Sequence, residues 1–341
     1  MNNDRSFKNI ISKLSNQVSL ESYELDIAFN SLLNGSATNA QIGAFLMGLS
    51  INGETAEIIA SGATILRSHA IKIKAPKEAI DTVGTGGDGA NTLNISSAAA
   101  FVVSGAGIPV AKHGNRSLSS KSGAADVLSE LGVNLDCPFE TVQKSLDELG
   151  ICFLMAPRHH SAMKYVGPAR VELGIRTIFN LLGPLSNPAF VKRQLVGVFD
   201  KKWLLPFAEA LKKMGSTNAW IVHAKDGLDE VSTTCETYIA QLKDSKIIEF
   251  SISPEQFGIK KNTLNSIKGG EPKDNALALK KLLNGSKGPY RDIVLFNSAA
   301  AIVSTGHESD FKTAIEMSIH SIDSGEASKK LNSLIKITNS F

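Results

Sequence analysis

A cluster of glycines in the first third of the chain constrains the fold more than any other feature. Residues 84–89 read Gly-Thr-Gly-Gly-Asp-Gly; they follow the apolar run 80–83, and residues 94–97 then open a stretch rich in alanine and valine. Glycines let a backbone turn sharply and bring its N–H groups close to an anion, and a helix N-terminus adds unpaired N–H groups and a positive dipole. The pattern of strand, glycine loop and helix predicts a phosphate cradle.

Two well-known nucleotide-binding patterns fail on this segment. The spacing of Gly84, Gly86 and Gly89 fits the dinucleotide fingerprint, which expects an acidic residue about twenty positions later for the ribose hydroxyls. Here residues 104–110 read Ser-Gly-Ala-Gly-Ile-Pro-Val, and the next acid is Asp126. A Walker loop is excluded because no Gly-Lys-Ser or Gly-Lys-Thr closes the run. A phosphate cradle of another family is the favoured interpretation, and a plain structural turn is its alternative.

Composition excludes several classes of protein. A chain of 341 residues is expected to form about two domains, and 43% hydrophobic residues are enough for a large core. A formal net charge of +3 with 20% charged residues argues against a nucleic-acid-binding coat. The three scattered cysteines fit neither a disulfide framework nor a zinc site, and no signal peptide or membrane-spanning run is evident. We therefore expect a soluble cytoplasmic protein.

The chain divides into a helical part and an alternating part. Residues 1–72 carry apolar residues at helical spacing and predict a small all-helical domain that packs a core or forms a dimer face. Across residues 73–341, short Val/Ile runs alternate with helical patterns, which predicts a large α/β domain with a mostly parallel central sheet flanked by helices. Residues 71–76 are the expected linker and hinge. Strands are expected near 80–83, 109–111, 151–154, 194–198, 220–223, 237–240 and 247–250, the last two as candidates for antiparallel pairing, and helices near 20–29, 40–47, 54–68, 94–106, 121–131, 139–149, 201–214, 274–283 and 298–303.

A second polar segment follows the apolar run that ends at Ala111. Residues 112–120 read Lys-His-Gly-Asn-Arg-Ser-Leu-Ser-Ser and lie where open α/β sheets place their ligand loops. Lys112 and Arg116 can neutralise phosphate, and the amide and hydroxyl groups between and after them can donate hydrogen bonds. A solvated basic loop that ends in a helix cap is the alternative. The neighbouring glycine loop favours the ligand interpretation.

Acidic residues follow the strand expected at 220–223. Residues 226–230 read Asp-Gly-Leu-Asp-Glu, and adjacent carboxylates at a strand exit suit a hard cation such as Mg²⁺, which prefers oxygen ligands. The alternative is that these are two solvated acids in a loop. A polyphosphate ligand nearby would require a cation, which favours the metal-binding interpretation.

The segment 157–185 is rich in proline, glycine and basic residues. His159 and His160 lack the partners and spacing of a zinc site, so packing or helix capping is expected for both. An arginine in such a segment could bind a carboxylate through two hydrogen bonds. No nucleophile paired with a base is evident in the sequence, which favours a reaction driven by electrostatics and positioning over covalent catalysis.

Five motifs follow one another along the chain. They are Gly-Thr-Gly-Gly-Asp at 84–88, Asn-Ile-Ser-Ser at 94–97, Lys-His-Gly-Asn-Arg at 112–116, Gly-Ile-Arg-Thr-Ile-Phe-Asn-Leu-Leu-Gly-Pro-Leu at 174–185 and Asp-Glu at 229–230. Together these motifs resemble the anthranilate phosphoribosyltransferase family of tryptophan biosynthesis. The resemblance spans nearly the whole chain. It implies Mg²⁺-dependent transfer of phosphoribose from 5-phosphoribosyl 1-pyrophosphate to the amine of anthranilate, with release of pyrophosphate. It also implies a homodimer joined through the small helical domain, to which a helical excursion near 160–185 returns, and no nucleic-acid or membrane partner.

The same resemblance implies the residues of the site. Those expected to bind the phosphoribosyl donor are Gly84, Gly87, Asp88, Thr92, Asn94, Ile95, Ser96, Ser97, Lys112, His113, Gly114, Asn115, Arg116, Ser117, Leu118, Ser119, Ser120 and Ala124. Ala124 stands where the family often has a serine, so any hydroxyl contact there is made by backbone or is absent. Ser96, Asp229 and Glu230 would hold Mg²⁺, and Gly84, Asn115 and Arg170 would bind anthranilate, Arg170 through the carboxylate. Lys112 and His113 are the catalytic candidates, and for His113 a positioning role and a role as base both stay open.

Two rival functions are compatible with this architecture. A pyrimidine nucleoside phosphorylase shares a similar phosphate loop but typically carries a different lysine segment and lacks this arrangement of Asp229 and Glu230. A nucleic-acid-binding relative should show a broad basic surface and eroded site motifs. The near-neutral charge and the intact motifs oppose the second rival.

Overall fold

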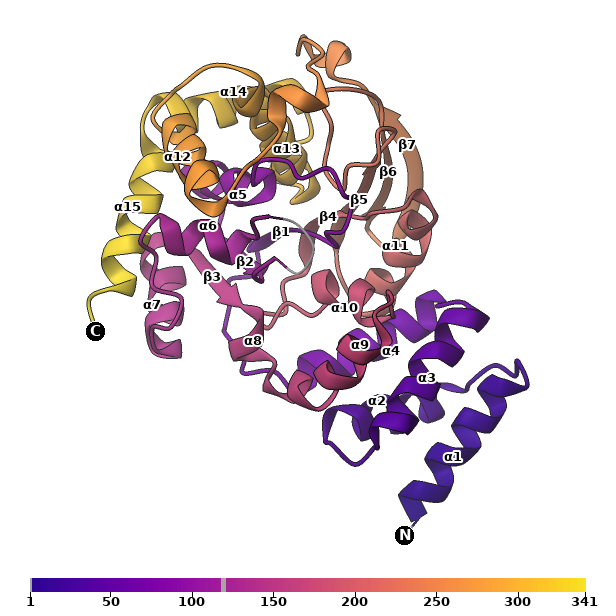
Figure 1. The fold of residues 1–341 in the computed structure, drawn as a ribbon. Helices are drawn as coiled ribbons and strands as arrows, with labels where there is room; N and C mark the ends of the chain where they lie inside the picture. Colours follow the sequence, from indigo (N-terminus) through magenta and orange to yellow (C-terminus); the bar gives the residue numbers. More distant parts are fainter. Residues whose placement is uncertain (1, 118–120) are drawn as a thin grey trace.

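The computed structural model describes residues 2–117 and 121–341, which form a helical bundle and an α/β part (Figure 1). The bundle contains α1 (Asn2–Ser15), α2 (Ser22–Leu33), α3 (Asn39–Asn52) and α4 (Ala56–Ser68). Thr38 and Thr55 accept hydrogen bonds from the backbone N–H groups three residues later, so polar N-cap residues set where α3 and α4 begin. The all-helical N-terminal region predicted from the apolar spacing is confirmed.

The α/β part is built on a single mixed sheet. Its strands are β1 (Ile80–Gly84), β2 (Val110–Gly114), β3 (Ile151–Met155), β4 (Arg193–Gly197), β5 (Asn218–Ala224), β6 (Thr237–Lys243) and β7 (Lys246–Ile252), in the order β3-β2-β1-β4-β5-β6-β7. The first five strands of that order are parallel, and β6 and β7 continue the sheet antiparallel. Both the parallel centre and the antiparallel extension agree with the sequence prediction.

Helices cover both faces of the parallel part of the sheet, so its strands carry apolar residues on both sides. Along β5, Trp220 and Val222 belong to one apolar cluster, and Ala219 and Ile221 belong to another on the opposite face. The helices packed in the first cluster are α5 (Ile95–Gly105), α6 (Ala124–Glu130), α12 (Pro272–Leu283), α13 (Pro289–Ser304), α14 (Phe311–Asp323) and α15 (Glu326–Thr338). On the second face α11 (Leu204–Lys213) packs, and α7 (Phe139–Leu149) covers β2 and β3.

The helical bundle shares its core with the second face of the sheet. Between β3 and β4 the chain returns to the bundle through α8 (Ala156–His159), α9 (Gly167–Leu173) and α10 (Phe179–Leu185). Leu182 of α10 packs with Phe29 of α2, and a side chain at Gly62 of α4 would approach both to within 3 Å. The small residue at position 62 therefore permits close helix contacts in the bundle. Short 3₁₀ helices occur at Ser161–Tyr165, Lys201–Trp203, Pro254–Phe257 and Leu264–Ile267.

The last two helices were absent from the sequence prediction. The predicted helix at 298–303 is only the end of α13, and α14 and α15 follow it. In α14 two of the buried positions are serines, and Ser321 Oγ donates to the carbonyl oxygen of Val102 at 2.7 Å. Polar residues at buried positions weaken the apolar period on which sequence prediction of a helix depends.

Two features of composition also have structural counterparts. Cys137, Cys152 and Cys235 are all free thiols. Among the described residues, every helix is too short or too polar to cross a bilayer.

Candidate active site

The predicted ligand loops meet at one edge of the sheet. From β1 the chain moves to β2 on one side, whereas β4 and β5 lie on the other side, so the strand order reverses between β1 and β4. Open α/β sheets bind ligands beyond the carboxyl ends of their strands at such a point. The glycine loop 84–89 begins at the end of β1. Residues 112–117 form the end of β2 and the start of the loop after it, and Asp229 lies in the loop after β5.

The glycine loop is folded around the carboxylate of Asp229. The Gly86 N–H donates to Asp229 Oδ2 at 2.7 Å. Gly86 and Gly87 have φ values of 65° and 76°, in the left-handed region that favours glycine. A side chain at Gly84 would collide with the carboxylate of Asp229, and one at Gly197 would collide with its backbone carbonyl. The glycines at 84 and 197 thus admit the acidic loop to the edge of the sheet.

The N-terminus of α5 holds the second carboxylate. The backbone N–H of Ser96 donates to Glu230 Oε1 at 3.1 Å, which places the negative charge at the positive end of the helix dipole. Asn94, which precedes the helix, accepts hydrogen bonds from Asn275 Nδ2 to its side chain and from the Tyr290 hydroxyl to its backbone carbonyl. Residues from α12 and α13 therefore fix the start of α5.

Lys112 is a buried cation beside these carboxylates. Its Nζ donates to the carbonyl oxygen of Thr82 at 2.5 Å and to Ser96 Oγ at 3.4 Å, and its side chain is 4% exposed. Burial lowers the pKa of Lys112, and the nearby charges of Asp81 and Glu230 oppose that change. The positive charge is thus held next to the helix terminus and the acidic pair.

The acidic pair has the chemistry of a site for a hard cation. Burial, followed by the charge of Asp88, raises the pKa of Asp229 to about 7. Burial and the charge of Asp229 raise the pKa of Glu230 well above its usual value. A divalent cation would offset the repulsion among these carboxylates, and their oxygens with Ser96 Oγ are ligands of the type Mg²⁺ prefers. No cluster of three or more His, Cys, Asp or Glu side chains is arranged as a metal site within residues 2–117 and 121–341, so substrate oxygens and water would complete the coordination.

His113 is a neutral, buried imidazole. Burial and then the neighbouring His160 keep its pKa well below the usual value, and the two rings lie 5.2 Å apart. His113 Nδ1 lies 3.2 Å from the carbonyl oxygen of Gly183, which can only accept, so Nδ1 carries the proton. His113 Nε2 is left as a buried nitrogen without a protein partner among the described residues. This arrangement fixes the ring and is compatible with a positioning role.

Asp81 of β1 is hydrogen-bonded to the end of β2. It is 0% exposed, and its carboxylate accepts from the His113 N–H at 3.1 Å and from Asn187 Nδ2 at 2.8 Å. Burial raises the pKa of Asp81 to about 6, although Lys112 lowers it. Asp81 therefore links β1, the Lys112–His113 segment and the turn at Asn187 through hydrogen bonds that no solvent reaches.

Replacing Asp81 by asparagine should change how stability depends on pH. Because folding raises this pKa from 3.8 to about 6, the stabilisation by the protonated carboxyl is complete below pH 3.8 and is lost as the pH rises through about 6. The free energy of unfolding of Asp81→Asn minus that of the wild type should therefore grow by about 2 kcal/mol between pH 4.5 and pH 7. Urea unfolding followed by circular dichroism at both pH values measures this difference. If the difference in free energy of unfolding between Asp81→Asn and the wild type stays constant with pH, the raised pKa of Asp81 is contradicted.

The rest of the predicted donor set is only partly gathered at this edge. Asp88 lies near Asp229, and its Oδ1 accepts from the Ala90 N–H at 3.1 Å. Thr92 pairs with Lys268 in a single β-bridge, and Ile95 and Ser97 have buried side chains, so only their backbones are available to a ligand. Leu118, Ser119 and Ser120 lie outside the described residues.

The loop after β2 is held by an acidic residue instead of lying open. Arg116 Nη1 pairs with Asp126 Oδ1 at 3.1 Å, and the N–H groups of Ser117 and Gly123 donate to Asp126 Oδ2. Asn115 is exposed and accepts from the Arg116 N–H through its side chain. Gly114 and Ala124 are half-buried, and a side chain at Gly114 would meet the ring of Phe153.

Arg170 stands apart from the phosphate elements. It lies near the end of α9, is half-buried, and its guanidinium lies 5.4 Å from the ring centroid of Phe179. Burial lowers its pKa, and among the described residues no acidic side chain contributes to that shift. The guanidinium is therefore a half-buried cation in the segment that returns to the bundle, and no described acidic side chain perturbs its titration.

Sequence reasoning missed several residues that build this site. Asp81, Asn275 and Tyr290 position the loops through buried hydrogen bonds, and no local pattern marks such partners because they come from distant parts of the chain. Gly197 gave a usable signal, since a glycine inside an otherwise apolar strand often marks a close backbone approach.

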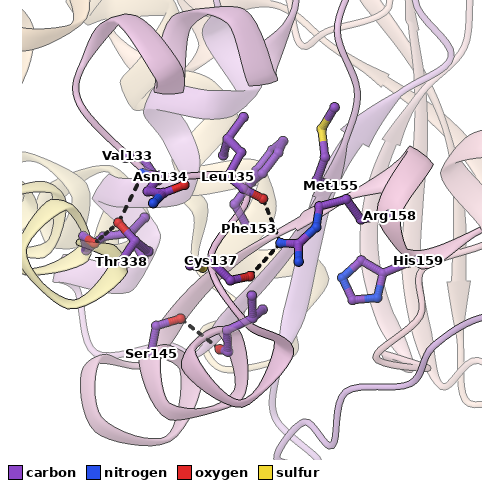
Figure 2. Close-up of a pocket in the computed structure, with 12 residues that line it drawn as sticks. Val133, Asn134, Leu135, Cys137, Ser145, Phe153, Met155, Arg158, His159 and Thr338 are labelled. Carbon is purple, nitrogen blue, oxygen red and sulfur yellow. Dashed lines mark hydrogen bonds between the residues drawn. The ribbon is translucent and has the colours of Figure 1, made fainter. Parts of the chain in front are cut away.

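A separate small pocket lies between β3, α7 and the end of α15 (Figure 2). Arg158 Nη1 donates there to the carbonyl oxygens of Leu135 and Cys137 at 2.8 and 2.6 Å, and the guanidinium lies over the ring of Phe139. None of the predicted site residues lines this pocket. His159 lies at its margin and Nδ1 bonds to the Ile71 carbonyl oxygen at 2.6 Å, which agrees with the packing role expected for it.

Comparison with known families agrees with the two-part fold. Residues 76–328 match the family described as "Glycosyl transferase family, a/b domain", and residues 8–70 match "Glycosyl transferase family, helical bundle domain". Among curated relatives, the anthranilate phosphoribosyltransferase of Parvibaculum lavamentivorans is 51% identical, with 98% of each chain covered. That of Azospirillum brasilense is 53% identical, with 98% of this chain and 93% of the relative covered.

Solved structures give the same result. The anthranilate phosphoribosyltransferase of Thermus thermophilus superposes with a TM-score of 0.92 at 36% identity, covering 97% of this chain and 99% of that one. The enzyme of Saccharomyces cerevisiae in complex with PRPP and Mg superposes with a TM-score of 0.89 at 31% identity, with 99% of each chain covered. With two domains in the same order and similarity over essentially its full length, the chain belongs to the anthranilate phosphoribosyltransferase family, a group of pentosyltransferases within the glycosyl transferase family.

Proposed function

We propose that the chain catalyses the reaction for which its family is named at the edge of the sheet between β1 and β4. Phosphoribose passes from 5-phosphoribosyl 1-pyrophosphate to the amine of anthranilate, and pyrophosphate leaves. The observation that carries this assignment is that Gly86 and Ser96, from the two phosphate-binding motifs, each donate a backbone hydrogen bond to one member of the Asp229–Glu230 pair. A phosphate cradle and a cation site are thereby one structure.

The electrostatics of the site suit this bond cleavage. As the C1–pyrophosphate bond breaks, cationic character develops on the ribose and negative charge grows on the leaving group. The glycine loop, the start of α5 and Lys112 are held in place by hydrogen bonds before the reaction begins, and donors preorganised in this way stabilise developing charge. The amine of anthranilate is neutral near pH 7, so alignment matters more than its deprotonation. We assign His113 a positioning role because its ring is neutral and fixed at Nδ1.

Mg²⁺ is the proposed cofactor, held by Asp229, Glu230 and Ser96 Oγ. When bound, it neutralises phosphate oxygens of the donor and leaving group. Support comes from the raised pKa values of both carboxylates, because the protein alone compensates their charge poorly. The yeast relative whose structure contains PRPP and Mg supports the same pairing of ligand and metal.

Fluorescence tests the activity directly. Anthranilate emission should fall when the protein, 5-phosphoribosyl 1-pyrophosphate and Mg²⁺ are present together, and it should persist if any one is omitted. Phosphorolysis of a pyrimidine nucleoside without loss of anthranilate would favour the phosphorylase alternative. DNA binding with a steep salt dependence and without turnover would favour the nucleic-acid-binding alternative.

For anthranilate we propose a site formed by Gly84, Asn115 and Arg170. Replacing Arg170 by alanine should raise the KM for anthranilate about 10- to 100-fold, because a charge-assisted hydrogen bond to the carboxylate is lost. The KM for the phosphoribosyl donor should change by less than about twofold. Steady-state kinetics with each substrate varied in turn measures both values. The exposed neighbour Val171, replaced by alanine, is the matched control, and equal damage to both KM values in Arg170→Ala would refute the carboxylate role.

We also propose a domain boundary at residues 72/73 and a homodimer joined through the helical bundle. The separate matches of residues 8–70 and 76–328 to two domain families support the boundary. Exposed apolar side chains on the bundle, among them Tyr23 and Ile51 at 62% and 71% exposure, support an interface there. Sedimentation equilibrium should give twice the mass of the chain, and a monomer at micromolar concentration would refute the dimer. A cytoplasmic location stays a prediction, with three free thiols in its favour.

A further inference from the structure

Arg176 lies in a short connection anchored to the helical bundle. α9 ends at Leu173, the next residue Gly174 caps it with a φ of 61°, and the connection leads directly into α10. The Thr177 N–H donates to Asn180 Oδ1 at 2.9 Å, and Ile178 is fully buried in the core shared by the bundle and the sheet. Arg176 itself is exposed. An exposed side chain therefore projects from a rigidly packed base.

The Arg176 guanidinium contacts the glycine loop on the other side of the site. Its Nη2 donates to the Gly87 carbonyl oxygen at 2.6 Å, and its centre lies 4.2 Å from the ring centroid of Phe199. Phe199 is tied to the same loop, because its N–H donates to Thr85 Oγ1 at 3.0 Å. The ring thus serves as a platform that orients the guanidinium toward Gly87.

This contact fixes the orientation of the peptide between Gly87 and Asp88. No cis peptide bond occurs in the described residues, and in a trans peptide the C=O and N–H groups point in opposite directions. With the carbonyl directed to Arg176, the N–H of Asp88 is directed to the opposite side of the loop. Rotation of this peptide changes ψ of Gly87 and φ of Asp88. Because Gly87 has no side chain to restrict it, a contact such as that with Arg176 is needed to select one orientation.

The orientation matters for a polyanionic ligand. A carbonyl oxygen turned toward phosphate would repel it, whereas an N–H group would donate a hydrogen bond to it. The loop is already held at Gly86 by Asp229, so Arg176 supplies a second anchor one residue later. Asp88, the next residue, carries the carboxylate whose charge acts on Asp229.

We propose that Arg176 is a positioning residue for the phosphoribosyl donor: it holds the Gly87 carbonyl toward the α9–α10 connection, so that the glycine loop presents N–H groups to the phosphates. This inference rests on the proposed function of the loop. Arg176 belongs to a motif that the donor, metal and anthranilate assignments leave without a role.

Replacing Arg176 by alanine and by lysine tests the proposal. Arg176→Ala should raise the KM for 5-phosphoribosyl 1-pyrophosphate about tenfold, because the loop loses a charge-assisted hydrogen bond that selects one peptide orientation. The KM for anthranilate should change by less than about twofold. Lysine at this position can donate to Gly87 but lacks the planar group that stacks on Phe199. The KM of Arg176→Lys for the phosphoribosyl donor should therefore lie between that of the wild type and that of Arg176→Ala. Since the side chain is exposed, the melting temperature of either variant should match that of the wild type.

Lys201→Ala is the matched control, because Lys201 is also an exposed cation over an aromatic ring, that of Tyr238, and none of the loop contacts described above involves its side chain. It should leave both KM values unchanged. Isothermal titration of each protein with the donor and Mg²⁺ separates the possible failures. If the wild type does not bind the donor, the proposed function fails. If the wild type and Arg176→Ala bind it equally, or if Arg176→Ala raises only the KM for anthranilate, the role given to Arg176 is wrong.

Discussion

Replacing Glu230 by glutamine is expected to lower kcat/KM about 100-fold or more, equivalent to about 3 kcal/mol of transition-state stabilisation. Glutamine keeps the size of the side chain and can still accept from the Ser96 N–H, so the start of α5 should stay in place. What is lost is one of the two charges that we propose hold Mg²⁺ beside the phosphates. The concentration of Mg²⁺ needed for half-maximal activity should rise at least tenfold, and Asp229→Asn should behave in the same way.

Asp226→Asn is the control for this experiment. Asp226 lies in the same loop, but its Oδ2 accepts hydrogen bonds from the hydroxyls of Ser232 and Thr234 within the loop itself. Its replacement should loosen the loop without changing the Mg²⁺ requirement beyond the effect of reduced stability. A titration with Mg²⁺ that is unaltered in Glu230→Gln would remove Glu230 from the metal site.

Replacing Gly197 by alanine should inactivate the enzyme although Gly197 is assigned no contact with substrate. The new Cβ would occupy the space of the Asp229 backbone carbonyl, so the loop after β5 must move away from the sheet. Forcing a methyl group into a packed site costs typically 1–3 kcal/mol, and here backbone must shift to receive it. We expect a loss of about 2 kcal/mol or more in the free energy of unfolding and a loss of Mg²⁺-dependent activity.

Gly167→Ala provides the comparison. Gly167 opens α9, and a Cβ there meets no atom within 4 Å, so the substitution should leave stability within about 0.5 kcal/mol of the wild type. Urea unfolding and steady-state kinetics measure both variants. Full activity in Gly197→Ala would mean that the loop carrying Asp229 adjusts freely, which would contradict the packing described for it.

The fold was largely predictable because its strongest signals are local. All seven predicted strands occur, and their bounds differ from the predicted ones by at most three residues at either end. Helices α14 and α15 were both missed, and in α14 serine takes two of the buried positions. The segment 156–185 was also hard to interpret, because Pro184 lies inside α10 and short helices carry little periodic signal.

The sequence motifs of the candidate site could be recognised, but the hydrogen bonds that join them could not be predicted. Residue type alone predicts an anion site from the glycine-rich loop 84–89 and Lys112. It likewise predicts a cation site from the acidic pair 229–230. That Asp229 is the acceptor for Gly86, or that Arg176 reaches Gly87, depends on contacts between residues about ninety or more positions apart, which no local pattern encodes. Asp81 illustrates the same limit, because its burial and its partners follow only from the packing of β1 beside β2.

The shared core of the bundle bears on how such enzymes can be recombined. Leu181, Leu182 and Leu185 from α10 are buried among side chains of α2, α3 and α4, so the bundle is completed by a segment that follows the third strand. A chimera that exchanges only residues 1–70 with a distant relative would pack the helices of one protein against the α10 residues of another. The two sets of core side chains would not be matched in size and shape. Exchanging 156–185 along with them should restore soluble expression, and the crossover points of functional hybrids are expected to fall on both sides of that return segment.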